Sequence, residues 1–363
     1  MRRFANIRDA HCAVALAATM ITAAACSDTT NSPDGSGGVD ADEGADAFAT
    51  SGANDGAGDS PDPRGSSGGE DDEVGDTGGG DESTGGSSGG FDPAPEAGPF
   101  DECPGDLPEG WIFCEDFEAL GDPSSVFFDY ADGEGNFTPE FDGGAASGVG
   151  AMRAHYREGV EAAGFLSVSF GANPINTSGR PGYSESDDFG EVYWRFRVKM
   201  QDGWPDAGPH NLTRISAFAQ ADWGQAMVAN LSSNGDGVTL LGQGSSCVDD
   251  GAVKCAGIDD ATKLEPVGTL AGRTALFSAE QAGEWRCVEA HVKLNTPGIA
   301  DGLFEFWVDG NLEASTGAVD WRGEWSEFGM NLLTLENFWV GGAPADLDRW
   351  FDDLVIATSP IGC

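Results

Sequence analysis

From Trp111 onward, the chain alternates apolar and polar residues in short runs separated by Gly, Asp, Asn and Pro. In the clearest run, residues 191–200, every second residue is apolar: Val192, Trp194, Phe196 and Val198. The residues between them are Tyr193, Arg195, Arg197 and Lys199. Because successive side chains of a strand point to opposite faces, this run predicts a strand with one buried and one polar face.

Two later runs follow the same pattern. Residues 285–294 place Val288, Ala290, Val292 and Leu294 on one face, with Glu289 and His291 on the other. Residues 303–309 place Phe304, Phe306 and Val308 opposite Glu305 and Trp307, and Asp309-Gly310 then gives a hairpin turn signal. Residues 226–231, 238–241 and 350–357 predict further strands. With no amphipathic helix longer than two turns in the pattern, the fold class is all-β, a sandwich or jelly roll.

The alternation is confined to the C-terminal part of the chain. Residues 27–100 hold 19 Gly and 18 acidic residues but only five large apolar residues. Such a segment buries too little surface to offset the entropy of ordering, so it predicts a disordered acidic tether. All ten Trp lie after residue 110, which predicts one globular domain over residues 101–363.

The first 26 residues have the features of a secretory signal. Arg2, Arg3 and Arg8 supply a positive region, and the apolar run 13–25 is too short to span a bilayer. The run ends in Ala-Ala-Ala-Cys, which resembles a bacterial lipobox and implies lipidation of Cys26. The alternative is an ordinary signal peptide cut near Ala25. We therefore expect an exported protein at the outer membrane or cell surface, with membrane contact only through the N-terminal lipid.

The charge of the chain excludes one class of partner. The formal net charge is -44, of which residues 101–363 contribute -29, from 14 basic and 43 acidic residues. Binding of nucleic acid needs a positive footprint, so this balance argues against a nucleic-acid partner.

The number of cysteines is consistent with an exported protein. Apart from Cys12 and Cys26, the chain has six, an even number that predicts three disulfides in an oxidising compartment: Cys103, Cys114, Cys247, Cys255, Cys287 and Cys363. Fifteen pairings are open, and the pair 247/255, which closes a short loop, is the firmest. No pair has the two-residue gap of a zinc knuckle, so zinc is disfavoured.

Four segments of the domain carry a resemblance to a known family. Residues 111–118 (WIFCEDFE), 189–200 (FGEVYWRFRVKM), 285–310 (WRCVEAHVKLNTPGIADGLFEFWVDG) and 351–362 (FDDLVIATSPIG) resemble successive landmarks of the concanavalin A-like lectin/glucanase superfamily. Residues 292–302 (VKLNTPGIADG) and 307–310 (WVDG) resemble the alginate- and glucuronan-type polysaccharide lyases. The resemblance implies a jelly roll of two curved antiparallel sheets, with a polysaccharide bound across the concave one.

The polar face of residues 191–200 is the first candidate site. The resemblance places Tyr193 and Arg195 on the concave surface, joined by residues of neighbouring strands. Aromatic rings would stack on sugars, while charged groups would hydrogen-bond their hydroxyls or carboxylates. The candidate glycan-binding residues are Tyr193, Arg195, Arg197, Glu289, His291 and Trp307.

A lyase needs a group that neutralises a uronate carboxylate and a base that removes the neighbouring proton. If the protein is a lyase, Arg195 or Asn211 would neutralise and Tyr193 or His210 would act as base. Asn211 stands where the resembled lyases carry a key Lys, and their later paired-Tyr strand has no counterpart. His210, Asn211 and Arg214 offer a substitute cluster. A retaining glucanase is disfavoured, because residues 185–191 do not match the spacing of its carboxylates.

The resemblance also implies a structural calcium ion, for which the first and last segments offer the hard oxygen ligands Asp116, Glu118 and Asp352 or Asp353, with Glu118 and Asp353 as the chosen pair. Three functions stay open at this point. The preferred hypothesis is a surface lipoprotein that binds a polysaccharide, whereas the alternatives are an active uronate lyase and a structural or adhesive protein without a sugar site.

Overall fold

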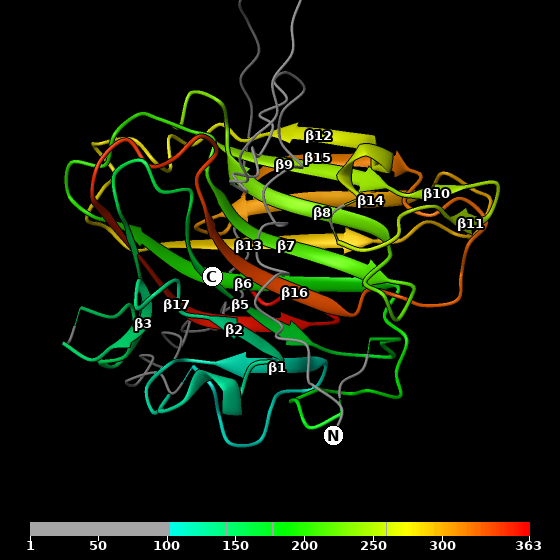
Figure 1. The fold of residues 1–363 in the computed structure, drawn as a ribbon, viewed down its shortest axis with the longest axis horizontal. Coiled ribbons are helices and arrows are strands. Elements are labelled where there is room, and N and C mark those ends of the chain that lie inside the picture. Colours follow the sequence, from blue (N-terminus) through cyan, green and yellow to red (C-terminus); the bar gives the residue numbers. More distant parts are fainter. Residues whose placement is uncertain (1–101, 143, 176–177, 259) are drawn as a thin grey trace, which may run out of the picture. The chain divides into compact units, whose positions relative to one another are not determined.

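The computed structural model describes residues 102–363, apart from residues 143, 176–177 and 259. Two large antiparallel sheets make up this part of the chain (Figure 1). The prediction of an all-β jelly-roll sandwich is confirmed, and the only helices in the described residues are short 3-10 turns, η2 (Pro123–Ser125) and η3 (Ala261–Lys263).

Sheet A has eight strands in the order β15-β14-β13-β6-β17-β4-β3, with β1 paired to β17. Their bounds are β15 (Asn311–Val319), β14 (Gly302–Val308), β13 (Arg286–Lys293), β6 (Glu191–Met200), β17 (Leu347–Ala357), β4 (Ala151–Tyr156), β3 (Phe137–Glu140) and β1 (Trp111–Glu115).

Sheet B has seven strands in the order β12-β9-β8-β7-β16-β5-β2. Their bounds are β12 (Glu265–Ala271), β9 (Leu240–Ser246), β8 (Gln225–Ser233), β7 (Asn211–Phe218), β16 (Leu332–Phe338), β5 (Ala162–Ser169) and β2 (Asp129–Ala131). A separate hairpin joins β10 (Val248–Asp249) to β11 (Ala252–Val253).

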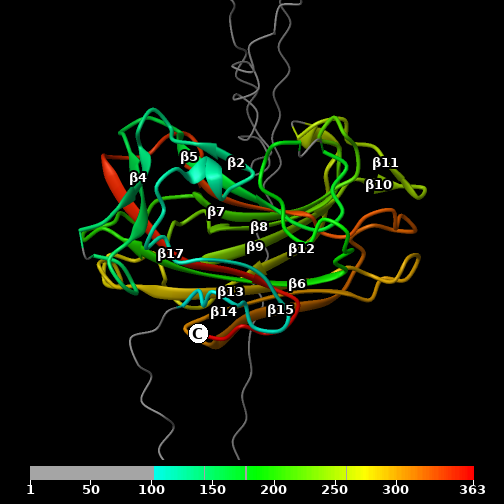
Figure 2. The same ribbon diagram turned by 90° about the horizontal axis from the view of Figure 1, so that it is seen from below.

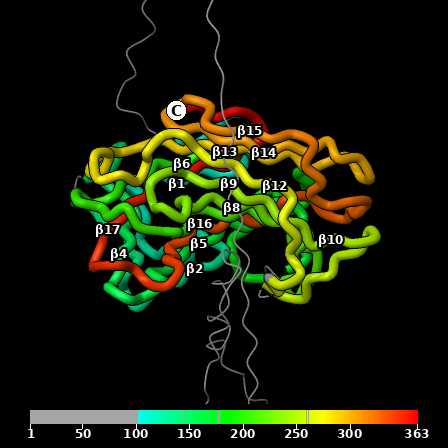
Figure 3. The backbone as a smooth tube through the Cα atoms, turned by 90° about the horizontal axis from the view of Figure 1, so that it is seen from above, coloured from blue at the N-terminus to red at the C-terminus, as the bar shows by residue number. Residues whose placement is uncertain are grey.

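The two sheets lie as stacked layers, as Figures 2 and 3 show. Sheet B curves so that its outer face is concave, and the outer face of sheet A is convex. The core fills the space between the layers, with alternate residues such as Trp194 and Phe196 of sheet A meeting Ile215 and Leu335 of sheet B. Trp194 Nε1 donates a hydrogen bond of 3.1 Å to Thr213 Oγ1, which ties the layers together.

The predicted strands at residues 191–200, 285–294, 303–309 and 350–357 correspond to β6, β13, β14 and β17 of sheet A, and the predicted run 226–231 lies within β8 of sheet B. Strand β6 has the predicted bounds, whereas β9 begins at Leu240 and runs to Ser246 instead of covering residues 238–241. Gly242 and Gly244 weaken the strand pattern there, yet a Cβ at Gly244 would lie 2.7 Å from the Trp321 ring. Close packing therefore requires glycine where the pattern predicts a break.

A buried arginine connects the two layers. Arg349 of β17 has 0% exposure and passes between the sheets, where its Nη2 lies 2.8 Å from the backbone oxygens of Asn211 and Glu336. The same nitrogen lies 2.8 Å from Asn337 Oδ1. Pairing shifts register at both places, in β7 between residues 211 and 213 and in β16 between residues 337 and 338. The guanidinium thus donates hydrogen bonds to carbonyl oxygens at or next to these irregularities in the ladder.

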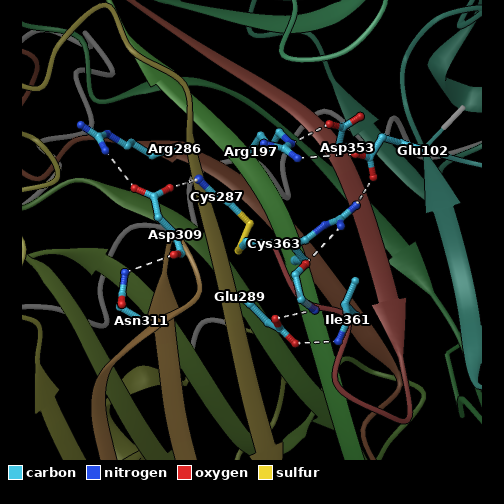
Figure 4. Close-up of a disulfide and its surroundings, with 12 residues drawn as sticks. Glu102, Arg197, Arg286, Cys287, Glu289, Asp309, Asn311, Asp353, Ile361 and Cys363 are labelled. Carbon is cyan, nitrogen blue, oxygen red and sulfur yellow. Dashed lines mark hydrogen bonds and ion pairs between the residues drawn. A yellow bond between two sulfur atoms is a disulfide. The ribbon is translucent and has the colours of Figure 1, made fainter. Parts of the chain in front are cut away.

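Three disulfides are present, as the six cysteines predict: Cys103–Cys114, Cys247–Cys255 and Cys287–Cys363. The sequence separations are 11, 8 and 76 residues respectively. Cys287 of β13 holds the C-terminal residue of the chain against sheet A (Figure 4).

Replacing Arg349 with Met is expected to lower the free energy of unfolding by about 3 kcal/mol or more, because several buried acceptors lose their donor. Denaturant unfolding followed by tryptophan fluorescence measures this. Arg286→Met is the matched control, since Arg286 pairs with the partly exposed Asp309 at 2.9 Å and should cost less than about 1 kcal/mol. Equal losses in the two variants would contradict the role given to Arg349.

Removing the disulfides one at a time should rank them by the loop each closes. In the chain-entropy relation, a loop of 76 residues contributes about 4.5 kcal/mol and one of 8 residues about 2.5 kcal/mol. We expect the variant with both Cys287 and Cys363 replaced by Ala to unfold at lower denaturant than the one with Cys247 and Cys255 replaced. The reverse order would show that native packing, not loop closure, decides the effect.

Candidate functional site

A row of polar side chains crosses the outer face of sheet B. Strand register aligns one residue from each of the seven strands, in the order Thr269, Gln243, Asn230, Arg214, Thr334, Ser167 and Asp129. Thr213 and Ile215, which flank Arg214, face the core, so Arg214 itself points outward. Adjacent strands lie about 4.8 Å apart, so the polar row extends about 29 Å across the concave face.

Arg214, at the middle of the polar row, belongs to an ion-paired cluster with Glu336 and Asn211. Arg214 Nη2 lies 3.0 Å from Glu336 Oε1, and Asn211 Nδ2 donates a 3.1 Å hydrogen bond to Glu336 Oε2. Glu336 is 2% exposed and Arg214 8% exposed, so little water competes for these contacts. From the core side, Arg349 binds the backbone oxygens of the same residues, Asn211 and Glu336. The cluster is therefore fixed from both faces of the sheet.

The polar-row side chains on the β9 side of this cluster have fewer hydrogen-bond partners within the protein. Asn230 and Gln243 are partly exposed, and neither side chain has a hydrogen-bond partner in the described part of the chain. On the other side, Ser167 Oγ and Thr334 Oγ1 share a hydrogen bond of 3.0 Å. The polar row thus offers two free amides, which can both donate and accept.

An aromatic cluster lies at one end of the strands that carry the polar row. It joins Phe218 and Leu332 to residues of the surrounding loops: Phe128, Ile175, Trp223 and Ile258. Trp223 is partly exposed and packs against Phe128 and Phe218 at ring distances of 6.1 and 5.6 Å. Its φ of 71° is unusual for a residue other than Gly, so the loop holds this ring in a conformation that costs free energy.

The structure separates the proposed substitute cluster. Asn211 and Arg214 meet at Glu336, but His210 is fully buried in the core among Trp204, Phe277 and Trp339. Its Nδ1 lies 3.2 Å from Arg349 Nη1. Burial and the neighbouring Arg349 charge hold the pKa of His210 well below its usual value. His210 therefore stays neutral and does not reach the concave face as a base.

The expectation that Tyr193 and Arg195 lie on the concave surface is wrong, because β6 belongs to sheet A. Their neighbours on its convex outer face are those predicted, since β6, β13 and β14 align Arg195, Glu289 and Trp307 in one row. In the next row Tyr193 stacks on His291 with ring centroids 3.8 Å apart. His291 contacts carboxylate oxygens of Glu191 and Glu305 at 2.9 Å each.

Tyr193 is not suited to act as a base. Burial, together with the charges of Glu191, Glu305 and Glu289, raises the pKa of Tyr193 to about 12. A tyrosine that removes a proton near neutral pH needs a lowered pKa. The other three tyrosines do not line the polar row either: Tyr130 and Tyr183 donate to backbone oxygens, and Tyr156 is buried in the core.

Segments at both ends of the domain contact polar side chains on the outer face of sheet A (Figure 4). Arg195 Nη2 contacts Glu102 Oε2 at 2.8 Å, and Arg195 Nη1 donates to the backbone oxygen of Gly362. Glu289 accepts hydrogen bonds from the backbone N–H groups of Ile361 and Gly362. Arg195 and Glu289 are each 5% exposed as a result. Arg195 and Glu289 hold the two end segments of the domain in place, and little of either side chain is left to contact a glycan.

The residues proposed for calcium do not fit the ion. Glu118 accepts hydrogen bonds from the backbone N–H groups of Val149 and Gly150, both at 2.8 Å. Asp353 accepts from Ser147 Oγ at 2.7 Å and pairs with Arg197 Nε at 2.9 Å. These carboxylates face donors, whereas calcium requires several oxygens directed at one point. Within the described ranges, no group of three or more His, Cys, Asp or Glu is arranged to hold a metal.

The signal peptide, the lipidation of Cys26 and the tether that the sequence predicts all fall outside the described residues. The described segments contain no helix with the length and apolar character that crossing a membrane requires.

Most residues of the polar row were missed in the sequence because their strands lack clear alternation. In β7 and β16 nearly every residue is buried, including polar ones such as Thr213 and Thr334. A strand buried on both faces gives no period of two, so the pattern conceals it. Only the polar Arg214 beside Asn211 in an apolar segment offered a signal.

Comparison with known proteins gives similarity in structure only. No protein-family model matches the chain, and no curated protein matches it in sequence. Among solved structures, an endo-β-1,4-glucuronan lyase from the fungus Trichoderma reesei is 14% identical and has a TM-score of 0.46, covering 68% of this chain and 95% of its own.

Two alginate lyases are similar at the same level. The enzyme from Aplysia kurodai is 12% identical with a TM-score of 0.45, covering 69% of this chain and 99% of its own. The enzyme from a Chlorella virus is 14% identical with a TM-score of 0.42, covering 64% of this chain and 100% of its own. These are the kinds of protein that the sequence resembles, and similarity this low supports no conclusion about the activity of this chain.

Proposed function

We propose that residues 102–363 bind a polysaccharide chain across the outer face of sheet B, along the polar row. The observation that carries the proposal is the alignment of polar side chains from all seven strands over about 29 Å. Four of them are at least partly exposed: Thr269, Gln243, Asn230 and Asp129. An extended polymer of hydroxyl-bearing rings matches such a linear set of donors and acceptors. Because strands hold these groups at fixed spacing, little ordering entropy remains to be lost on binding.

The aromatic cluster supports the same ligand class. Trp223 offers a partly exposed ring beside the strands of the polar row, and aromatic faces stack favourably on apolar faces of sugar rings. A site with amides along its length and an aromatic ring at one end suits a glycan better than it suits a compact metabolite.

Cleavage of the polysaccharide is not favoured by the site. The polar row contains neither tyrosine nor histidine, and His210 is neutral and buried behind it. The candidates predicted on Glu191–Met200 lie on the opposite sheet, where Arg195 binds Glu102. Binding without bond cleavage is thus the function that the arrangement supports best.

Export and anchoring remain part of the proposal. The positive region and apolar run of residues 1–26, the Cys at position 26 and the three disulfides all suit a lipid-anchored protein in an oxidising compartment. In this arrangement Cys26 carries the lipid that enters the membrane, and the tether that follows holds the glycan-binding domain away from the membrane surface.

Replacing both Asn230 and Gln243 with Ala should weaken binding to a responsive polysaccharide about tenfold, because two hydrogen bonds are lost. Affinity electrophoresis and calorimetry over a panel of cellulose, β-glucan, xylan, mannan, alginate and glucuronan would measure this. Trp307→Ala on sheet A is the matched control and should leave the affinity unchanged. Loss of binding in Trp307→Ala alone would transfer the site to sheet A, and no binding to any polymer would favour a structural or adhesive role.

Replacing Cys26 with Ser should abolish incorporation of a labelled fatty acid and release the protein from the membrane fraction. The measurement requires expression of the full chain in a bacterium that processes lipoproteins, followed by fractionation. An ordinary signal peptide would instead give unlabelled protein outside the cell from both the parent chain and the variant.

A further inference from the structure

The charges carried by sheet B bear on which polysaccharide it binds. Within the seven strands of this sheet there is one basic residue, Arg214, against three acidic residues, Asp129, Glu265 and Glu336. Residues 101–363 as a whole carry -29, from 14 basic and 43 acidic residues. A polymer with a carboxylate on each ring would approach a negative surface within a negative domain.

The single cation of the sheet is already neutralised. Arg214 Nη2 is 3.0 Å from Glu336 Oε1, and the side chains are 10% and 3% exposed. Asn211 occupies the second oxygen of Glu336, which fixes the carboxylate toward Arg214. A uronate that recruited Arg214 would have to displace a buried carboxylate, and the displaced charge would be left without its partner.

The polar-row side chains that have no partner within the described residues are suited to hydrogen-bond sugar hydroxyls. Asn230 and Gln243 are amides, and Thr269 is a hydroxyl on the next strand, so each both donates and accepts. Sugar hydroxyls need this pairing, whereas carboxylates accept only and are held best by charged donors. Arg180, an exposed cation, lies over the Phe128 ring of the aromatic cluster at 4.9 Å and is not part of the polar row.

We infer that the polysaccharide bound on sheet B is neutral, and that the Arg214–Glu336 pair excludes uronate polymers by holding the only cation of the sheet in a neutral pair. This inference rests on the proposed function and specifies its ligand class. It also separates the protein from an alginate- or glucuronan-directed function, because charge on the site opposes those substrates.

The test compares neutral and uronate polymers at low and high salt. The parent chain should bind at least one of cellulose, β-glucan, xylan or mannan with an affinity that changes little with salt, and should bind alginate and glucuronan at least tenfold more weakly. Neither uronate polymer should yield the ultraviolet absorbance of unsaturated products.

The variant Glu336→Gln should gain binding to alginate or glucuronan of about tenfold or more, because it leaves Arg214 with an uncompensated charge. The gain should fall as salt is added. In the double variant Arg214→Gln/Glu336→Gln the net charge of the parent is restored, so the gain should disappear. Glu305→Gln, which removes one carboxylate from sheet A, is the matched control and should produce no gain. Thermal unfolding of each variant verifies that it is folded.

The outcomes separate the inference from the proposed function. Salt-sensitive binding of alginate or glucuronan by the parent chain, weakened in the Asn230→Ala/Gln243→Ala variant, would overturn the inference and leave the proposed function standing. A folded Glu336→Gln variant without any gain would also overturn the inference. Absence of binding to every polymer of either class would overturn both.

Discussion

The contact between Arg349 and the bulged ends of β7 and β16 is the constraint on which the site depends. A buried guanidinium without a carboxylate partner in the described residues is costly, and burial lowers the pKa of Arg349 accordingly. Carbonyl oxygens of Asn211 and Glu336 offset that cost, together with the faces of Tyr156 and Phe351 at 5.4 and 4.8 Å. Because the same two residues pair on the concave side, the inter-sheet contact also fixes the middle of the polar row.

The sequence pattern predicts the strands of sheet A better than those of sheet B. Strands β6, β13 and β14 of sheet A have one face in the core and one polar face, so the period of two is plain and even Leu294 is placed on the correct side. Sheet B carries buried residues on both faces and glycines at positions 242 and 244, so its alternation is lost. The fold class follows mainly from the strands of sheet A, whereas the candidate site lies on sheet B.

The residue types on the polar face of β6 also indicate a ligand site that the structure does not support. A strand face with Tyr193, Arg195 and Arg197 has the composition of a ligand-binding surface, and the resemblance placed it on the concave side. In the structure, Arg195 and Arg197 contact Glu102, while Glu289 contacts the last residues of the chain. Segments at the two ends of the domain are far from these strands in sequence, so their role as partners depends on tertiary contacts that local patterns do not contain. The polar row likewise depends on strand register, which aligns residues that are distant in sequence.

The docking of Glu102 has a mechanical consequence. The chain enters the described domain at residue 102, on sheet A, while the polar row lies on sheet B. A pulling force applied through that entry point passes into the covalent Cys103–Cys114 bond and then into β1, which pairs with β17. The load path therefore runs along sheet A to the strand that carries Arg349. Tension from a polymer held on the polar row would reach this same strand through β7 and β16, so that the two load paths meet at Arg349.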